Sequence, residues 1–149
     1  GYPLLVENHV EGHDHRMMVV DGALLWVYRR TLPYVTGDGR ASLRELIARE
    51  NARRRTASAA HRFYLKDIEI VPALERFVAD QYGIAPDSVP AEGARIDLAG
   101  QANLAQGGTL KDVTGAVHPD NRELAQRIAR LFRAGALGID FITPDIARS

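Results

Sequence analysis

The spacing of apolar residues changes along the chain between a period of two and a period near 3.6, which predicts strands alternating with helices. Two short apolar runs, 17–20 and 23–28, flank the pair Asp21-Gly22, and such a pair between two apolar runs predicts a β-hairpin. Both runs carry apolar residues on both faces, so we expect both faces of the hairpin to be covered. Alternation of large with small or polar residues predicts two more strands, at 95–98 and 137–141.

Start and stop signals mark two helices in the middle of the chain. Ser42, with Glu45 three residues later, forms a capping box in front of a stretch with apolar residues on one helical face. A second helix is predicted from Pro72 to a stop at Gly83, because proline suits the first helical turn and glycine suits the position after the last. Its predicted inward-facing residues are Leu74, Phe77 and Val78.

A third helix is predicted from Pro119 to Gly135, and its apolar stripe is expected to consist of Leu124, Ile128 and Leu131. Between the first two helices, residues 53–60 combine three arginines with small side chains, and we expect this stretch to be disordered. The three arginines could hold an acidic substrate, but a solvated basic patch is the favoured interpretation. The segment Gly37-Asp38-Gly39 predicts a tight turn rather than a phosphate loop, since no Lys-Ser/Thr ending follows.

Composition limits the classes of protein that remain. The chain has 149 residues, 46% of them hydrophobic and 26% charged, which is enough for one globular domain with a real core. The formal net charge is zero, so nothing global indicates nucleic acid or a membrane surface. Cysteine is absent, which excludes disulfides, thiolate metal sites and cysteine nucleophiles. No apolar run reaches the roughly 18 residues of a membrane span.

The segment before the hairpin has the layout of a nucleotide hinge. A short apolar strand, 4–6, runs into Glu7, and Gly12 follows five residues later. The backbone after such a strand can offer one N–H and one C=O to an adenine edge. Asp14, as an ionised acceptor, can take both hydroxyl protons of a ribose, and Arg16 offers five donors that suit a phosphate.

The same segment carries three histidines, which allow a rival interpretation. His9, His13 and His15 follow the spacing H-x-x-x-H-x-H, and imidazoles at such spacing can bind zinc. Gly12 argues against the helix that would bring His9 and His13 together. Exposed loop histidines beside the nucleotide are the favoured interpretation.

Six blocks of residues follow one another along the chain: the hinge at 6–16 and residues 36–47, 87–93, 102–114, 118–121 and 138–146. Taken in this order, the blocks resemble the ATP-grasp ligases, most closely the cyanophycin synthetase-like and glutathione synthetase-like members. The resemblance runs over nearly the whole chain but corresponds only to the second half of an ATP-grasp unit. It implies an α+β fold, with a mostly antiparallel sheet and helices packed on it. The chain, 1–149, would then be one partial ATP-grasp domain without the N-terminal subdomain and the last metal-ligand strand.

The resemblance also implies roles for residues of the hinge and of the strand that follows the hairpin turn. Glu7 would face the adenine amino group, and the backbone of Asn8, His9 and Val10 would clamp the ring. Asp14 would hold the ribose. Arg30, at the end of that strand, would lie near the phosphates or the acyl-phosphate, although an exposed cation at a strand end is an equal alternative.

A glycine-rich loop is the second site that the resemblance indicates. The pair Gly107-Gly108 lets a backbone come close to a ligand, and consecutive N–H groups can form an anion nest. With Thr109, the loop would face phosphate and acceptor substrate, and Asn103 would anchor it. Two departures weaken any inference about substrate, since family members often carry an arginine where Ala99 stands and an aspartate where Gly115 stands.

Asp140 is the strongest single candidate for a metal ligand. It shares a strand face with Gly138, which predicts open space above the strand, and a lone carboxylate there would need a partner. By resemblance, that partner is a magnesium ion bridging nucleotide phosphates. Asp140 would be the first of three ligands, and the other two would lie on a later strand that this chain does not reach. A strand-end aspartate satisfied by a loop N–H remains the alternative.

The resemblance implies the ATP- and Mg²⁺-binding part of a cytoplasmic carboxylate–amine ligase that forms an amide through an acyl-phosphate. The expected substrate is an amino acid or small peptide, and the expected partner is the rest of a parent polypeptide, with no nucleic acid and no membrane. A homo-oligomer is left open. The fragment alone is expected to be inactive. Two alternatives are a non-catalytic nucleotide-binding module and a histidine-based zinc protein.

Overall fold

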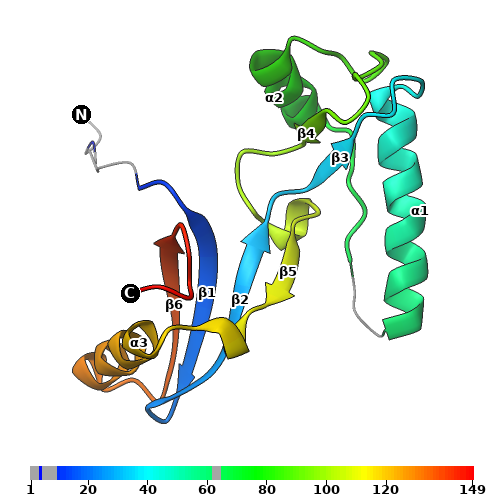
Figure 1. The fold of residues 1–149 in the computed structure, drawn as a ribbon. Coiled ribbons are helices and arrows are strands. Elements are labelled where there is room, and N and C mark those ends of the chain that lie inside the picture. The colour runs from blue at the N-terminus through cyan, green and yellow to red at the C-terminus, as the bar shows by residue number, and fades with distance from the viewer. Residues whose placement is uncertain (1–3, 5–9, 62–64) are drawn as a thin grey trace. The chain divides into compact units, whose positions relative to one another are not determined.

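The computed structural model describes residues 4, 10–61 and 65–149 of the chain, which divides into two compact units (Figure 1). Unit 1 consists of Gly1–Arg30 together with Lys111–Ser149, and unit 2 is the continuous segment Thr31–Leu110. Each unit has a hydrophobic core of its own. No helix among the described residues is long and apolar enough to cross a membrane.

The main sheet has four strands in the order β5-β2-β1-β6. β1 is antiparallel to both of its neighbours, β2 and β6, as expected for a mostly antiparallel sheet. The predicted hairpin turn between β1 and β2 is confirmed, since Asp21 and Gly22 have φ angles of 48° and 77°, which a type I′ turn requires. The strands are β1 His13–Val20, β2 Ala23–Thr31, β5 Thr109–Asp112 and β6 Ala136–Thr143.

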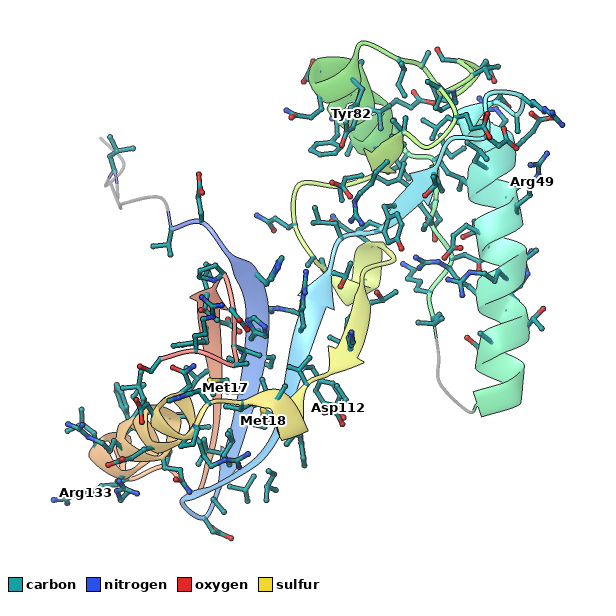
Figure 2. The ribbon with its side chains drawn as sticks, in the orientation of Figure 1. Met17, Met18, Arg49, Tyr82, Asp112 and Arg133 are labelled. Atoms are coloured by element: carbon teal, nitrogen blue, oxygen red, sulfur yellow. The ribbon has the colours of Figure 1, made fainter. Side chains whose placement is uncertain are left out.

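One helix, α3 (Pro119–Phe132), packs against this sheet through β1 and β6. The buried side chains of β1 alternate with partly exposed ones, so Met17 and Met18, labelled in Figure 2, lie on opposite faces. Met17 is 1% exposed and belongs to the core with α3, whereas Trp26, which pairs with Met18, is 38% exposed. The expectation that both faces of the hairpin are covered is therefore wrong, because the described part of unit 1 contains one helix, and that helix covers one face.

The apolar stripe predicted for α3 is also wrong. The residues that α3 buries are Asn121, Ala125 and Ala129, while Leu124 is 42% and Leu131 is 79% exposed. Small side chains let the helix backbone come close to the sheet, so the larger side chains point elsewhere. The helix also ends earlier than predicted, at a left-handed Arg133 (φ 50°) instead of Gly135.

Unit 2 packs two helices beside a short antiparallel pair of strands. The second predicted helix is confirmed, since Leu74 and Val78 are buried and Gly83 ends it in the left-handed conformation. The capping box is also confirmed, because the Ser42 N–H donates to Glu45 Oε2 at 2.8 Å and the Glu45 N–H donates back to Ser42 Oγ at 3.3 Å. The elements of unit 2 are β3 Tyr34–Thr36, α1 Leu43–His61, α2 Pro72–Tyr82, β4 Arg95–Asp97 and the 3-10 turn η1 Leu104–Gln106.

The stretch 53–60, expected to be disordered, is instead the C-terminal half of α1. Arg54 is only 2% exposed, and its guanidinium donates to Glu50 Oε1, to the Lys66 carbonyl and to the Gly107 carbonyl, at 2.8, 3.0 and 2.6 Å. A solvated basic patch is therefore the wrong description of Arg54, although Arg53 and Arg55 are exposed. The buried ion pair and the two carbonyl contacts hold this half of the helix in place.

Candidate functional site

Four of the predicted site residues meet on the face of the unit 1 sheet that α3 does not cover. Alternation along β1 places Asp14 and Arg16 on the same face, opposite the buried His15. The strand register sets Arg16 directly across from Asp140 on β6. On the other side of β1, Arg29 is opposite His15, so the next residue, Arg30, comes level with Asp14.

These four side chains form one chain of ion pairs, called the charge cluster below. Arg16 Nη1 lies 2.8 Å from Asp140 Oδ1, and Arg30 Nη2 lies 2.9 Å from the same oxygen. Arg30 Nη2 also lies 2.7 Å from Asp14 Oδ1. Two guanidinium groups and two carboxylates make the cluster neutral as a whole. The hydrogen bond to Asp14 is the main cause that raises the pKa of Arg30 above its ordinary value, against the opposing effect of burial.

The charge cluster is accessible from solvent in part. The Asp140 side chain is 56% exposed and that of Arg16 is 43% exposed, while Asp14 and Arg30 are more covered, at 35% and 27%. Arg30 Nε is buried and finds no hydrogen-bond partner among the described residues. A buried donor without an acceptor costs free energy.

Gly138 has a different role from the one expected. A Cβ at this position would come within 2.5 Å of Arg16 Nη2, so the guanidinium of Arg16 lies directly over the glycine. The space above the strand is therefore not open, and Asp140 is not a lone carboxylate. Both features follow from the register, which puts an arginine beside the glycine and across from the aspartate.

Apolar side chains on the same face adjoin the charge cluster. Ile142 pairs with Asp14 in the β1–β6 register and is 50% exposed, and Tyr28 pairs with Arg16 on the other side. Met18 and Trp26 continue this surface toward the hairpin end of the strands. Apolar surface with a few convergent polar groups is the usual composition of a small-molecule site.

The hinge is described only in part. Glu7, Asn8 and His9 lie outside the described residues, so their expected contacts stay predictions. Val10 is 56% exposed and precedes β1. At Gly12, a Cβ would come within 2.6 Å of the Thr143 backbone, so the glycine allows the chain to pass closely against the end of β6.

The histidines of this segment occupy different environments. His13 is exposed, and its Nδ1 lies 2.9 Å from Arg29 Nη2. His15 is 1% exposed, and burial lowers its pKa, with backbone hydrogen bonds at Phe141 and His13 acting in the opposite direction. Within the described ranges, no group of three histidine or carboxylate side chains is placed to hold a metal ion. His9, the third histidine of the zinc interpretation, is outside those ranges.

The glycine-rich loop of unit 2 is held by its own hydrogen bonds. Asn103 Oδ1 accepts from the Ala105 N–H at 2.9 Å, so its side chain caps η1. The Gly107 and Gly108 N–H groups donate to the carbonyls of Leu104 and Asn103, at 3.1 and 2.9 Å. These N–H groups are therefore in use within the loop, and the contact of Asn103, Gly107, Gly108 and Thr109 with phosphate or substrate stays a prediction.

Close packing explains why glycine is needed at position 107. Its φ is 89°, in the left-handed region, and a Cβ there would lie 2.7 Å from Ile68 Cγ1 and 3.2 Å from Arg54 Nη1. Arg54 is thus the residue whose role sequence reasoning missed. The sequence does show Glu50 four residues before Arg54, a spacing that predicts an ion pair on a helix. This spacing does not indicate whether the pair is buried.

Comparison with known proteins supports the resemblance seen in the sequence. No protein-family model matches the chain. It is 35% identical over 145 residues to the cyanophycin synthetase of Trichormus variabilis and 34% identical over 142 residues to the glutathione biosynthesis bifunctional protein GshAB of Streptococcus thermophilus. The match covers 97% and 95% of this chain but only 16% and 19% of those proteins, so the chain spans less than a fifth of their length.

A solved structure agrees with these relatives. The crystal structure of a bifunctional glutathione synthetase from Pasteurella multocida superimposes with a TM-score of 0.71 and 28% sequence identity, over 95% of this chain and 19% of that one. The fold is that of an ATP-grasp protein, and the predicted α+β class is confirmed. The resemblance of the chain to the ATP-grasp ligases, in particular to their cyanophycin synthetase-like and glutathione synthetase-like members, is therefore confirmed.

Proposed function

We propose that this chain is the ATP- and Mg²⁺-binding part of a carboxylate–amine ligase, which forms an amide bond through an acyl-phosphate. Homology to two ligase-type enzymes over nearly the whole chain supports the general class. The charge cluster is the observation that carries the nucleotide-binding part of the proposal. The substrate would be an amino acid or a small peptide.

ATP would bind by exchanging partners within the charge cluster. Phosphate oxygens suit guanidinium donors as well as carboxylates do, so Arg16 and Arg30 can turn from the two aspartates to the phosphates. Asp14 is then free to accept from the ribose hydroxyls, and Asp140 is free to contact a cation. Ile142, which is exposed and pairs with Asp14, offers apolar contact area at the hinge end of the strands, where the base would lie.

The residues present fit a magnesium ion that is shared with the ligand. Magnesium is commonly held by one or two carboxylates, waters and substrate phosphates, so a complete protein cage is not required. Asp140 has the greatest exposure of the four charged side chains and could reach such an ion. When bound, the ion would neutralise charge on the phosphoryl group. Arg30, close to both aspartates, would position the same group, and no covalent nucleophile is needed.

Isothermal titration of the chain with ATP, with and without Mg²⁺, tests the exchange of partners. In the absence of Mg²⁺, Asp140→Asn should bind ATP about threefold more tightly than the unchanged chain, because a charge that repels phosphate and holds both arginines is removed. In the presence of Mg²⁺ the order should reverse, with Asp140→Asn about tenfold weaker, because a metal ligand is lost.

Asp21→Asn is the matched control, since it removes the same charge from unit 1 at the other end of β1, where asparagine suits the turn. It should leave ATP binding unchanged under both conditions. If Mg²⁺ affects Asp140→Asn and the unchanged chain equally, Asp140 does not hold the metal. If neither protein binds ATP, the nucleotide-binding proposal is wrong.

A further inference from the structure

A cavity of about 460 Å³ lies within unit 2, apart from the charge cluster. Its walls come from the segment that leads into α2, from the first turns of α2, from the chain after β4 and from η1. All of its lining residues belong to unit 2, so its shape does not depend on unit 1. Its volume is within the usual range for a small-molecule site.

The floor of the cavity is apolar. Leu74 and Leu98 are 6% and 2% exposed and belong to the core of unit 2, and Phe77 is packed against that core. Gly100 keeps the chain close to the Phe77 ring, at a distance where a Cβ would just touch it. Ala99 leaves room at the side of the cavity. A rigid apolar floor of this kind suits a branched aliphatic or an aromatic side chain.

The mouth of the cavity carries one cation and one anion that are held only weakly by each other. Lys66 Nζ lies 3.8 Å from Glu69 Oε1, and the two side chains are 41% and 67% exposed. Such a long, exposed pair contributes little to stability and is easily exchanged for other partners. Asp67, in contrast, is bound to Arg55 at 2.6 Å. Lys66 and Glu69 are therefore the two charges free to meet a ligand.

The start of α2 adds positive potential on the same wall. Val71, Ala73 and Leu74 line the cavity, and the N-cap Val71 makes no side-chain capping bond. The N–H groups of a first helical turn attract a carboxylate through the helix dipole. A carboxylate near Lys66 would benefit from both groups.

We propose that this cavity binds a free amino acid with a large apolar side chain. The α-carboxylate would contact Lys66 and the first turn of α2, the α-ammonium would contact Glu69, and the side chain would lie on Leu74, Phe77 and Leu98. This site rests on the proposed function and deepens it, because an amino acid is the proposed substrate and Ala105 and Gln106, which line the cavity, belong to the loop expected to face the acceptor substrate. The amino-acid titration contains no nucleotide and the ATP titration contains no amino acid, so a failure of one proposal is distinguishable from a failure of the other.

Calorimetric titration of the whole chain with L-phenylalanine, in the absence of nucleotide, tests the site. We expect saturable binding in the millimolar range or tighter, and about tenfold weaker binding or none with L-aspartate, whose side chain would bring a charge onto the apolar floor. Absence of saturation up to about 20 mM L-phenylalanine, or equal binding of L-aspartate, would overturn the proposal.

Two pairs of variants locate the binding. Ala99→Trp fills the cavity and should weaken L-phenylalanine binding at least about tenfold, whereas Ala79→Trp, at an exposed position of α2 outside the cavity, should not. Lys66→Gln should weaken binding about threefold to tenfold, whereas Lys111→Gln, which removes the only other lysine, should not. Melting curves check that each variant is folded. Equal behaviour of the two members of either pair would overturn the assignment.

Discussion

At the scale of single residues, the surroundings of a charge decide what it does. Arg54 and Arg55 are neighbours in the same basic run, yet one is buried against carbonyl oxygens and the other is 60% exposed. The difference arises because residue 54 lies on the face of α1 that meets the loop at Gly107. A run of like charges in a sequence does not reveal this, since periodicity places residues on faces but does not say which polar residue is covered.

Arg54→Met should lower the free energy of unfolding by about 3 kcal/mol, because two buried carbonyls lose their donor and the half-buried Glu50 keeps only Arg53. Urea unfolding followed by circular dichroism measures the change. Arg55→Met is the matched control and should cost at most about 1 kcal/mol, as an exposed pair does. Equal losses for both variants would contradict the role given to Arg54.

His15 should make the stability of the chain depend on pH in a range where the carboxylates do not titrate. Burial lowers its pKa below the ordinary 6.5, so the unfolded chain takes up a proton first as the pH falls. Stability is thus present above about pH 6.5 and is lost as the pH falls below it. Urea unfolding between about pH 7.5 and about pH 5.5 measures the loss, and His15→Phe should remove most of it. If His15→Phe loses as much stability over this pH range as the unchanged chain does, the pH dependence does not come from His15.

At the scale of elements, local sequence signals predicted the hairpin turn and the helix starts correctly. They did not predict which faces of the hairpin and of α3 are buried. The hairpin and the capping box depend on backbone geometry within a few residues, which the sequence specifies. The register beyond the hairpin depends on a β-bulge between Met18 and Val19. Without that bulge, Asp14 would lie opposite Arg29, and Arg30 would point to the other face. Since a one-residue bulge has no distinct sequence signal here, the ion pairs of the charge cluster could not be predicted from the sequence, and the family resemblance indicated only the individual residues.

The face that α3 buries gives a direct test of the packing. Ala129 is 2% exposed, so Ala129→Leu should destabilise the chain by about 1–3 kcal/mol through overpacking against the sheet. Leu131→Gln, two residues further along the same helix, should change stability by less than about 0.5 kcal/mol because its side chain is exposed. Thermal or urea unfolding measures both changes. If Leu131→Gln destabilises the chain more than Ala129→Leu does, the predicted apolar stripe is the buried one.

At the scale of the whole molecule, each of the two units has a hydrophobic core of its own. The four residues of the charge cluster, which we propose bind nucleotide, all belong to unit 1, and the glycine-rich loop belongs to unit 2. Neither boundary is marked by a change in composition, because strands β2 and β5 run through the boundaries without a linker. This is why a single domain was expected from length and composition alone.

Unit 2 should fold when it is produced alone, since residues 31–110 are continuous and contain a complete core. We expect a helical circular dichroism spectrum and one cooperative unfolding transition. A shorter fragment, 31–94, is the control and should not fold, because it lacks the buried Ile96 and Leu98. A non-cooperative 31–110 fragment would mean that unit 2 depends on unit 1.

The order of strands in the main sheet has one more consequence. The chain passes into unit 2 at the end of β2 and comes back at the start of β5, and these two strands are neighbours. The pair β2 and β5 can therefore be regarded as a hairpin whose loop has been replaced by a folded insert, unit 2. Inserts at such positions can be lengthened, exchanged between relatives or replaced by a short turn without rethreading the strands. Unit 1 and unit 2 can thus acquire changes separately, as two modules of one gene.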